Sequence, residues 1–281
     1  MQATIQYIKK ELAELYPETE VQGFIRILFE SVCGWDYTAQ ILNKNERVSN
    51  SDFNKIERVV LRLKEFEPIQ YILGETEFMD LKLIVDSSVL IPRPETEELV
   101  NWIIETNSSN SPRILDIGTG SGCIPLVLKK QIVNATVLAV DISDKALEIA
   151  TQNAILNNLD IHFFNVDILN WGNYNWDLFD VIVSNPPYVR EVEKQAMLPN
   201  VLKYEPENAL FVSNEDPLIF YKRIAEFAKK YLVEKGKLFF EINEYLGDEM
   251  CSLLENKGFA DVELRKDING KNRMISCTKK I

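Results

Sequence analysis

Two short motifs in this sequence hold residue types that can do chemistry. The tetrapeptide Asn185-Pro186-Pro187-Tyr188 follows the apolar run DVIVS, and the glycine-rich stretch DIGTGSG occupies positions 116 to 122. The first proline favours an extended conformation at Asn185, and both prolines fix their own φ angles, so the loop is stiff and its carbonyl oxygens stay free as acceptors. A rigid set of acceptors suits an NH2 group. We therefore interpret the two motifs as parts of a site for methyl transfer to a planar nitrogen.

The stretch DIGTGSG predicts a turn between a strand and a helix, and we call residues 116–122 the glycine turn. Glycine at every second position lets a ligand approach the backbone closely. The spacing departs from the dinucleotide fingerprint, whose third glycine comes one residue later, so a nicotinamide cofactor is disfavoured. The residues of the turn that we predict to bind a cofactor are Asp116, Gly118, Thr119, Gly120, Ser121 and Gly122.

Asp141 closes the next apolar strand pattern, TVLAVD. At that position of a nucleotide-binding fold, a carboxylate can accept hydrogen bonds from both hydroxyl groups of a ribose. We therefore predict that Asp141 binds the nucleoside part of the cofactor.

The tetrapeptide can activate a nitrogen by orienting it. An amide nitrogen is a poor nucleophile, so its lone pair must be aimed at the methyl group. The Asn185 side-chain oxygen and the Pro186 carbonyl would each accept one N–H, while Tyr188 would stack on the amide plane. Holding both reactants supplies on the order of 7 to 11 kcal/mol, so no general base is needed. The single histidine, His162, lies inside an expected strand and is predicted to pack there.

Six ordered stretches, spread over nearly the whole chain, resemble release factor glutamine methyltransferases of the HemK/PrmC type. They are PIQYILGETEF at 68–78, LIPRPETEELV at 90–100, DIGTGSG, SNPPYV at 184–189, YEPENAL at 204–210 and DINGKNRM at 267–274. The resemblance implies a Rossmann-like class I methyltransferase that uses S-adenosyl-L-methionine. Its expected substrate is the N5 amide nitrogen of the Gly-Gly-Gln glutamine in class I peptide chain release factors, in the cytoplasm.

The resemblance also assigns residues. Asn185, Pro186 and Tyr188 are expected to be catalytic, the whole tetrapeptide including Pro187 to bind substrate, and Asn185 to touch the cofactor as well. Asp116 would face the amino acid portion of the cofactor. Asp167 would lie near the adenine, with either Ile168 or Trp171 packing on the ring. Contact of Thr96 and Glu97 with the cofactor stays open.

Composition limits the possible partners. The chain has 281 residues, a formal charge of −12 and a pI near 4.8, which disfavours a nucleic acid backbone and fits a basic protein partner. The four cysteines lack paired short spacings, which favours a reducing compartment without a zinc site. No apolar run approaches the roughly 18 residues of a membrane span. We expect no metal, membrane or nucleic acid partner.

The sequence pattern divides the chain into three parts. Residues 1–74 read as a small all-α bundle, which through the resemblance is expected to dock the release factor, and 75–92 as a β-hairpin linker. In the bundle, a helix is expected at 37–42 and another at 52–66 with Ser51 as N-cap. Residues 93–281 alternate strands and helices, which predicts a parallel sheet covered on both faces. The resemblance adds that the last strand runs antiparallel.

Three other functions fit parts of the pattern. The tetrapeptide also suits the amine of adenine, but a nucleic acid methyltransferase must extract its base, and no target-reading domain or basic stripe is evident. A ribosomal protein glutamine methyltransferase is the second alternative, although RPETE at 93–97 resembles the release factor type. The third is a non-catalytic adaptor, which the intact tetrapeptide disfavours.

Overall fold

The structure is a computed structural model that describes residues 1–280, and these form two compact units. The helical unit comprises Met1–Gly74 together with Leu198–Tyr204. The larger unit comprises Glu75–Met197 and the described residues from Glu205 onward. Among residues 1–280, no helix has the length and apolar character needed to cross a membrane.

The helical unit is a bundle around one apolar core. Its helices are α1 (Gln2–Leu12), α2 (Glu18–Cys33), α3 (Tyr37–Leu42), α4 (Asn50–Lys64), α5 (Ile69–Leu73) and α9 (Pro199–Tyr204). The helical spacing predicted from the sequence places Ile8 and Leu12 in this core, where both are fully buried against Leu28 and Leu63 of the neighbouring helices. Leu15 follows the end of α1 and is partly exposed.

The N-cap of α4 differs from the prediction. Ser49, not Ser51, precedes the helix, and its Oγ accepts a hydrogen bond of 3.0 Å from the backbone N–H of Asp52. The Ser49 hydroxyl in turn donates to the Asp52 carboxylate at 2.8 Å, so the two residues form a reciprocal cap. Ser51 lies inside the first turn and is exposed. A serine followed three residues later by an acidic residue was the signal in the sequence.

The chain returns to the helical unit after the tetrapeptide. Helix α9 packs there, with the Tyr204 hydroxyl donating to the Glu65 carbonyl at 2.9 Å and the Lys203 ammonium 3.6 Å from the Glu65 carboxylate. The sequence pattern places this segment within 93–281, whereas the structure groups Leu198–Tyr204 with the helical unit. The connection from the tetrapeptide to the following motif YEPENAL therefore runs through the helical unit.

The larger unit begins with a hairpin. Strands β1 (Glu75–Phe78) and β2 (Leu81–Ile84) pair antiparallel across a two-residue turn. Both turn residues have positive φ, 46° at Met79 and 60° at Asp80, which matches the twist of the flanking strands.

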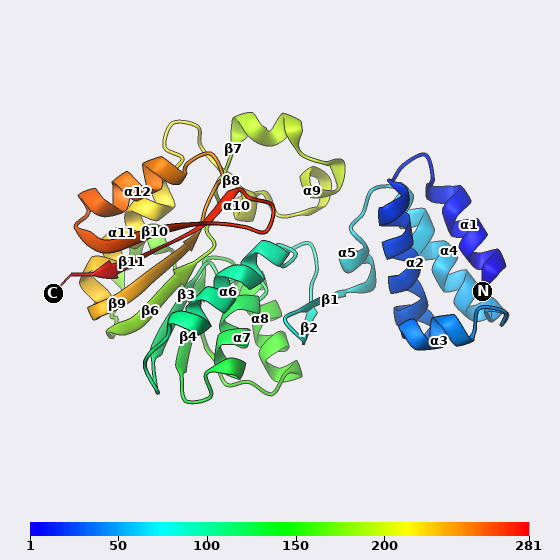
Figure 1. The fold of residues 1–281 in the computed structure, drawn as a ribbon, viewed down its shortest axis with the longest axis horizontal. Coiled ribbons are helices and arrows are strands. Elements are labelled where there is room, and N and C mark those ends of the chain that lie inside the picture. Colours follow the sequence, from blue (N-terminus) through cyan, green and yellow to red (C-terminus); the bar gives the residue numbers. More distant parts are fainter. Residues whose placement is uncertain (281) are drawn as a thin grey trace. The chain divides into compact units, whose positions relative to one another are not determined.

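Within residues 1–280, seven strands form the central sheet, in the order β10-β11-β9-β6-β3-β4-β5 (Figure 1). Strands β3, β4, β5, β6 and β9 run parallel, and β11 is antiparallel to both neighbours, which confirms the expected class of fold. Their bounds are β3 Arg113–Ile117, β4 Thr136–Asp141, β5 His162–Asn165, β6 Phe179–Ser184, β9 Leu232–Glu241, β10 Phe259–Lys266 and β11 Asn272–Lys279. A small parallel pair joins β7 (Val189–Arg190) to β8 (Phe211–Val212).

Both edges of the sheet differ from simple apolar strands. The sequence pattern did not identify β10, because Phe259 is its only fully buried residue and the rest alternates with polar side chains. On the other edge, His162 of β5 is exposed, so the prediction that it packs in the interior is wrong. A histidine on an edge strand has solvent on one side and needs no buried partner.

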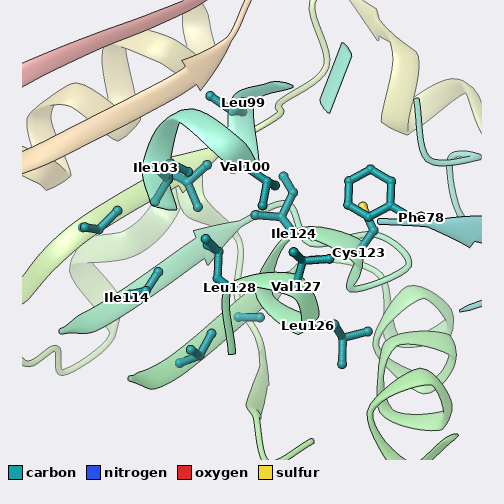
Figure 2. Packing of buried hydrophobic residues seen from close by; sticks show 14 of the residues in the cluster. Phe78, Leu99, Val100, Ile103, Ile114, Cys123, Ile124, Leu126, Val127 and Leu128 are labelled. Atoms are coloured by element: carbon teal, nitrogen blue, oxygen red, sulfur yellow. The ribbon is translucent and has the colours of Figure 1, made fainter. Parts of the chain in front are cut away.

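Helices cover both faces of the sheet. One layer contains α6 (Pro94–Thr106), α7 (Cys123–Gln131) and α8 (Asp144–Leu156), and the other contains α11 (Ile219–Tyr231) and α12 (Gly247–Asn256). The remaining short segments are η1 (Ile168–Asn173), η2 (Glu191–Ala196) and α10 (Glu207–Leu210). Alternate strand residues point to opposite layers: Ile114 packs with Leu99 and Leu126 in the cluster drawn in Figure 2, whereas Leu115 packs toward α11 and α12.

The N-cap assignment is testable within α4. Replacing Ser49 with Ala removes the cap and should destabilise the first turn by about 1 kcal/mol, whereas Ser51→Ala should change little. Hydrogen exchange of the α4 amides, followed by mass spectrometry, measures the difference. Equal loss of protection in both variants would contradict the assignment.

Candidate active site

The parallel strands bring polar residues to one edge of the sheet. Asp116, Asp141, Ser184 and Glu241 lie at or next to the carboxyl ends of β3, β4, β6 and β9. Ligands of open α/β sheets bind outside this edge. A cavity of about 310 Å³ opens here, lined by residues 118–121 of the glycine turn, residues 185–187 of the tetrapeptide and the segments after β4 and β5. Its size is that of a small-molecule site.

The glycine turn needs its glycines for two different reasons. Gly118, Gly120 and Gly122 all have positive φ, 76°, 54° and 81°. A Cβ on Gly122 would lie 3.1 Å from the Ala150 side chain, so this residue lets α7 begin close against α8. A Cβ on Gly120 would meet nothing within 4 Å, which leaves backbone open on the pocket side.

Asp141 lines the pocket and also holds the glycine turn. One carboxylate oxygen accepts from the Gly120 N–H and the other from the Ser143 N–H, each at 2.9 Å. Burial raises the pKa of Asp141, and these backbone hydrogen bonds oppose the rise. Each oxygen keeps acceptor capacity for a ligand hydroxyl. The sequence indicated the ligand role but not the bond to the turn.

Buried polar groups around the turn lack partners among the described residues. The hydroxyls of Thr119 and Ser121, which both line the pocket, and the two carboxyl oxygens of Asp116 make no hydrogen bond within residues 1–280. Asp116 is fully buried behind the lining, and burial raises the pKa of its carboxyl to about 7. Because unpaired buried groups are costly, the turn fits a polar ligand with cationic character.

The tetrapeptide is fixed beside the glycine turn. The Ser184 hydroxyl donates to the Ile117 carbonyl at 2.7 Å and so joins the ends of β6 and β3. A Cβ on Gly118 would lie 4.0 Å from the Asn185 carbonyl oxygen. Asn185, Pro186 and Pro187 all line the pocket, and Pro186 is buried. Two motifs far apart in the sequence thus share one cavity.

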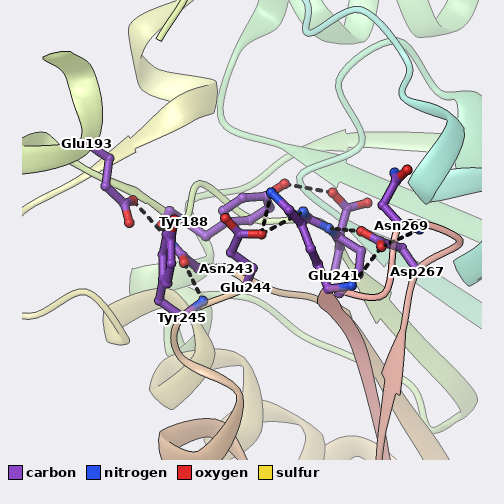
Figure 3. Close-up of polar contacts among 10 residues, drawn as sticks. Tyr188, Glu193, Glu241, Asn243, Glu244, Tyr245, Asp267 and Asn269 are labelled. Carbon is purple, nitrogen blue, oxygen red and sulfur yellow. Dashed lines mark hydrogen bonds and ion pairs between the residues drawn. The ribbon is translucent and has the colours of Figure 1, made fainter. Parts of the chain in front are cut away.

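Tyr188 is not among the described residues that line the pocket, and it lies behind them. Its hydroxyl donates to Glu241 at 2.8 Å, and its carbonyl accepts from the Asn243 side chain at 3.0 Å (Figure 3). Burial raises the pKa of the Tyr188 hydroxyl well above its ordinary value. In this arrangement Tyr188 supports the loop, and its stacking on a substrate amide stays a prediction.

The segment after β5 forms the far end of the cavity. Asp167, Ile168 and Leu169 line it. The Asp167 carboxylate caps the following η1 turn, accepting from the Leu169 N–H at 2.9 Å and from the Asn170 side chain at 2.6 Å. Trp171 points to α11 instead, with its ring edge-on to those of Phe227 and Tyr231. Of the two candidates for adenine packing, the pocket contains Ile168.

Thr96 and Glu97, for which the sequence leaves contact with the cofactor open, lie in different environments. Thr96 lines the pocket at the start of α6, and its hydroxyl donates to Glu241 at 2.6 Å. Glu97 accepts from the Met79 N–H at 3.1 Å and thereby ties α6 to the hairpin turn.

Several residues that shape the site escaped the sequence analysis. Asn153 of α8 is fully buried, bonds both the N–H and the carbonyl of Ile84, and donates to the Ser121 carbonyl at 2.9 Å. Arg93, which lines the pocket, pairs with buried Glu205 at 2.5 Å. This pair joins the motifs LIPRPETEELV and YEPENAL. An asparagine inside the apolar pattern of a helix was the available signal for Asn153.

Comparisons with known proteins identify the family of the chain. The family profile described as the PrmC N-terminal domain matches residues 3–74, and that of the methyltransferase small domain matches 96–210. A protein of Flavobacterium psychrophilum named release factor glutamine methyltransferase is 48% identical, over 94% of this chain and 94% of its own length. The chain belongs to the release factor glutamine methyltransferase family. A Bacteroides thetaiotaomicron protein of the same name is 42% identical over 97% of this chain and 98% of its own.

Solved structures agree with the fold. A methyltransferase from Pyrococcus furiosus superimposes with a TM-score of 0.54 at 19% identity, covering 80% of this chain and 98% of that one. The 16S rRNA N2 G1207 methyltransferase of Thermus thermophilus, solved with AdoMet and guanosine, gives a TM-score of 0.52 at 18% identity, covering 73% of this chain and 50% of that one. At such identities the likeness concerns the fold alone.

The buried carboxyl of Asp116 predicts a pH effect on stability. Its pKa is about 7 in the folded protein against an ordinary value of 3.8, so the folded state binds the proton more tightly. Stability of the cofactor-free wild type should therefore fall as pH rises from about 4 to about 7, by up to roughly 4 kcal/mol. Asp116→Asn removes the titrating group. The free energy of unfolding of this variant, relative to that of wild type, should therefore increase as the pH rises from 5 to 8.

Urea unfolding of both proteins at the two pH values measures this gain. A constant difference between wild type and Asp116→Asn across that range would contradict the raised pKa.

Proposed function

We propose that this protein transfers a methyl group from S-adenosyl-L-methionine to N5 of the glutamine in the Gly-Gly-Gln motif of class I peptide chain release factors, and so modulates translation termination in the cytoplasm. The relatives that carry the release factor glutamine methyltransferase name cover almost the whole chain. We further propose that the helical unit docks the release factor, since the family profile described as the PrmC N-terminal domain matches residues 3–74.

One observation carries the proposal. Residues 118–121 of the glycine turn and residues 185–187 of the tetrapeptide line the same cavity, and a Cβ on Gly118 would lie 4.0 Å from the Asn185 carbonyl oxygen. A cofactor on the turn and an amide at Asn185 would therefore be neighbours. Methyl transfer requires such direct approach of donor and acceptor.

The lining supports S-adenosyl-L-methionine as the cofactor, which supplies a methyl group on a positively charged sulfur. Asp141 offers two carboxylate oxygens to the ribose hydroxyls, and the unpaired hydroxyls of Thr119 and Ser121 offer polar contacts at the turn. Ile168 and Leu169 give the adenine an apolar surface, and Asp167 lies beside them. Asp116, whose pKa is about 7 without ligand, lies behind the turn, and the cationic groups of a bound ligand would favour its ionised form.

The residues of the tetrapeptide would orient the substrate. The Asn185 side-chain oxygen would accept one N–H of the glutamine amide and the Pro186 carbonyl the other, so that the nitrogen lone pair points at the methyl group. Positioning of this kind supplies on the order of 7 to 11 kcal/mol. A base is unnecessary, and the single histidine lies exposed on β5. The proton leaves to water after transfer.

A nucleic acid substrate has less support. The formal charge of −12 opposes binding of a phosphate backbone. The resemblance to RNA methyltransferases such as the 16S rRNA enzyme is at 18% identity and concerns the fold.

Transfer of radiolabelled methyl from S-adenosyl-L-methionine to a purified class I release factor tests the proposal. Label should appear on the wild-type factor and be absent from a factor whose Gly-Gly-Gln glutamine is replaced by alanine. Equal label on both factors, or none on either with cofactor binding intact, would refute the proposed substrate.

Two variants of this chain separate chemistry from cofactor binding. Asn185→Ala should lower kcat by roughly 100- to 1,000-fold, because an oriented acceptor is lost, with a nearly unchanged cofactor dissociation constant. Asp141→Ala should weaken cofactor binding first, by roughly ten- to a hundredfold. Steady-state kinetics and calorimetry give the two constants. Full activity of Asn185→Ala would exclude its proposed role, and an unchanged dissociation constant would remove Asp141 from the ribose.

A further inference from the structure

We propose that Thr96 and Glu241 are positioning residues that decide which end of the Asn185 side-chain amide faces the substrate. The inference rests on the proposed function, since it explains how the acceptor of the substrate N–H is presented. It concerns three residues from three elements: Thr96 at the start of α6, Asn185 after β6 and Glu241 at the end of β9.

The three side chains form one hydrogen-bond chain. The Thr96 hydroxyl donates to Glu241 Oε2 at 2.6 Å, and Asn185 Nδ2 donates to Thr96 Oγ1 at 3.4 Å. Thr96 and Glu241 are only 2% and 1% exposed, so solvent does not compete for the bond between them. Thr96 and Asn185 both line the pocket, whereas Glu241 lies behind them.

The direction of the chain is set by Glu241. Its Oε1 accepts from the Tyr188 hydroxyl at 2.8 Å, so both of its oxygens receive a donor. Burial raises the pKa of Glu241, and the bonds from Thr96 and Tyr188 together with the positive charge of Arg273 oppose that rise. With a hydroxyl donor at each oxygen, Glu241 binds both partners as an ionised carboxylate, which only accepts hydrogen bonds.

The single hydroxyl proton of Thr96 determines the orientation of the Asn185 side-chain amide. Because that proton is given to Glu241, the Thr96 oxygen can offer Asn185 only a lone pair. The group of Asn185 that faces Thr96 must then be the NH2 group, and Oδ1 must point the other way. The oxygen and the nitrogen of the Asn185 side-chain amide have nearly the same shape, so their assignment follows from the hydrogen-bond network.

This orientation matters for the reaction. The substrate amide presents N–H donors, and only the Asn185 oxygen can accept one of them. Rotation of the Asn185 amide by half a turn would oppose two NH2 groups and turn the substrate nitrogen away from the methyl group. Without the Thr96 hydroxyl, nothing in this chain of bonds favours one orientation over the other.

Thr96→Val tests the inference, because valine keeps the shape and removes the hydroxyl. We expect kcat to fall roughly ten- to a hundredfold, as for a misplaced reacting group, with little change in the cofactor dissociation constant. Thr96→Ser restores the hydroxyl and should recover most of the lost kcat. Thr106→Val is the matched control on the same helix, where the hydroxyl donates to the Trp102 carbonyl at 2.8 Å, and should behave as wild type. Thr96→Ala replaces the valine variant if that protein fails to fold.

A second readout does not depend on the substrate. In protein labelled with 15N-asparagine, the side-chain NH2 signals that disappear in Asn185→Asp belong to Asn185. These signals should shift in Thr96→Val and stay in place in Thr106→Val. If they are unmoved and kcat stays at the wild-type value, the inference is wrong, and a parallel loss of kcat in Thr96→Ser would also overturn it. Absence of transfer by the wild type would refute the proposed function alone, because the NMR result still decides whether the Thr96 hydroxyl binds the Asn185 NH2 group.

Discussion

The site depends on carboxylates that are wholly or partly removed from water at one edge of the sheet. The parallel strands place Asp116, Asp141 and Glu241 there, and removing a charged group from water is costly unless donors surround it. Asp141 and Glu241 each receive two hydrogen bonds from the protein, whereas the Asp116 oxygens receive none within the described residues. Two of the three carboxylates therefore act as supports, and the third is left for electrostatic interaction with a ligand.

Each support fixes a different wall of the cavity. Asp141 holds the open backbone of Gly120, where a cofactor can lie, and Glu241 connects through Thr96 to Asn185, where an amide can lie. Glu241 also binds the Tyr188 hydroxyl, so that the loop after β6 is anchored at both ends of the tetrapeptide. The rigid part of the site thus rests on strand ends, and the prolines between them add stiffness.

The sequence was sufficient for those features that depend on local patterns. Apolar strand patterns separated by helical segments predicted the sheet, and their order placed the glycine turn, Asp141 and Asn185 at one edge. What it missed depends on contacts between distant residues: Asn153 with Ile84, Arg93 with Glu205, and Thr96 with Glu241. No local period marks such pairs. The association of α9 with the helical unit was missed for the same reason, whereas β10 was missed because polar side chains interrupt its apolar pattern.

The most direct test of this account is a crystal structure with S-adenosyl-L-homocysteine and glutamine bound. The account predicts the nucleoside at Asp141 and the glycine turn, and the glutamine amide nitrogen within hydrogen-bond distance of Asn185 Oδ1 and the Pro186 carbonyl, facing the sulfur. A glutamine bound away from the tetrapeptide, or an Asn185 NH2 group turned toward the amide nitrogen, would contradict it.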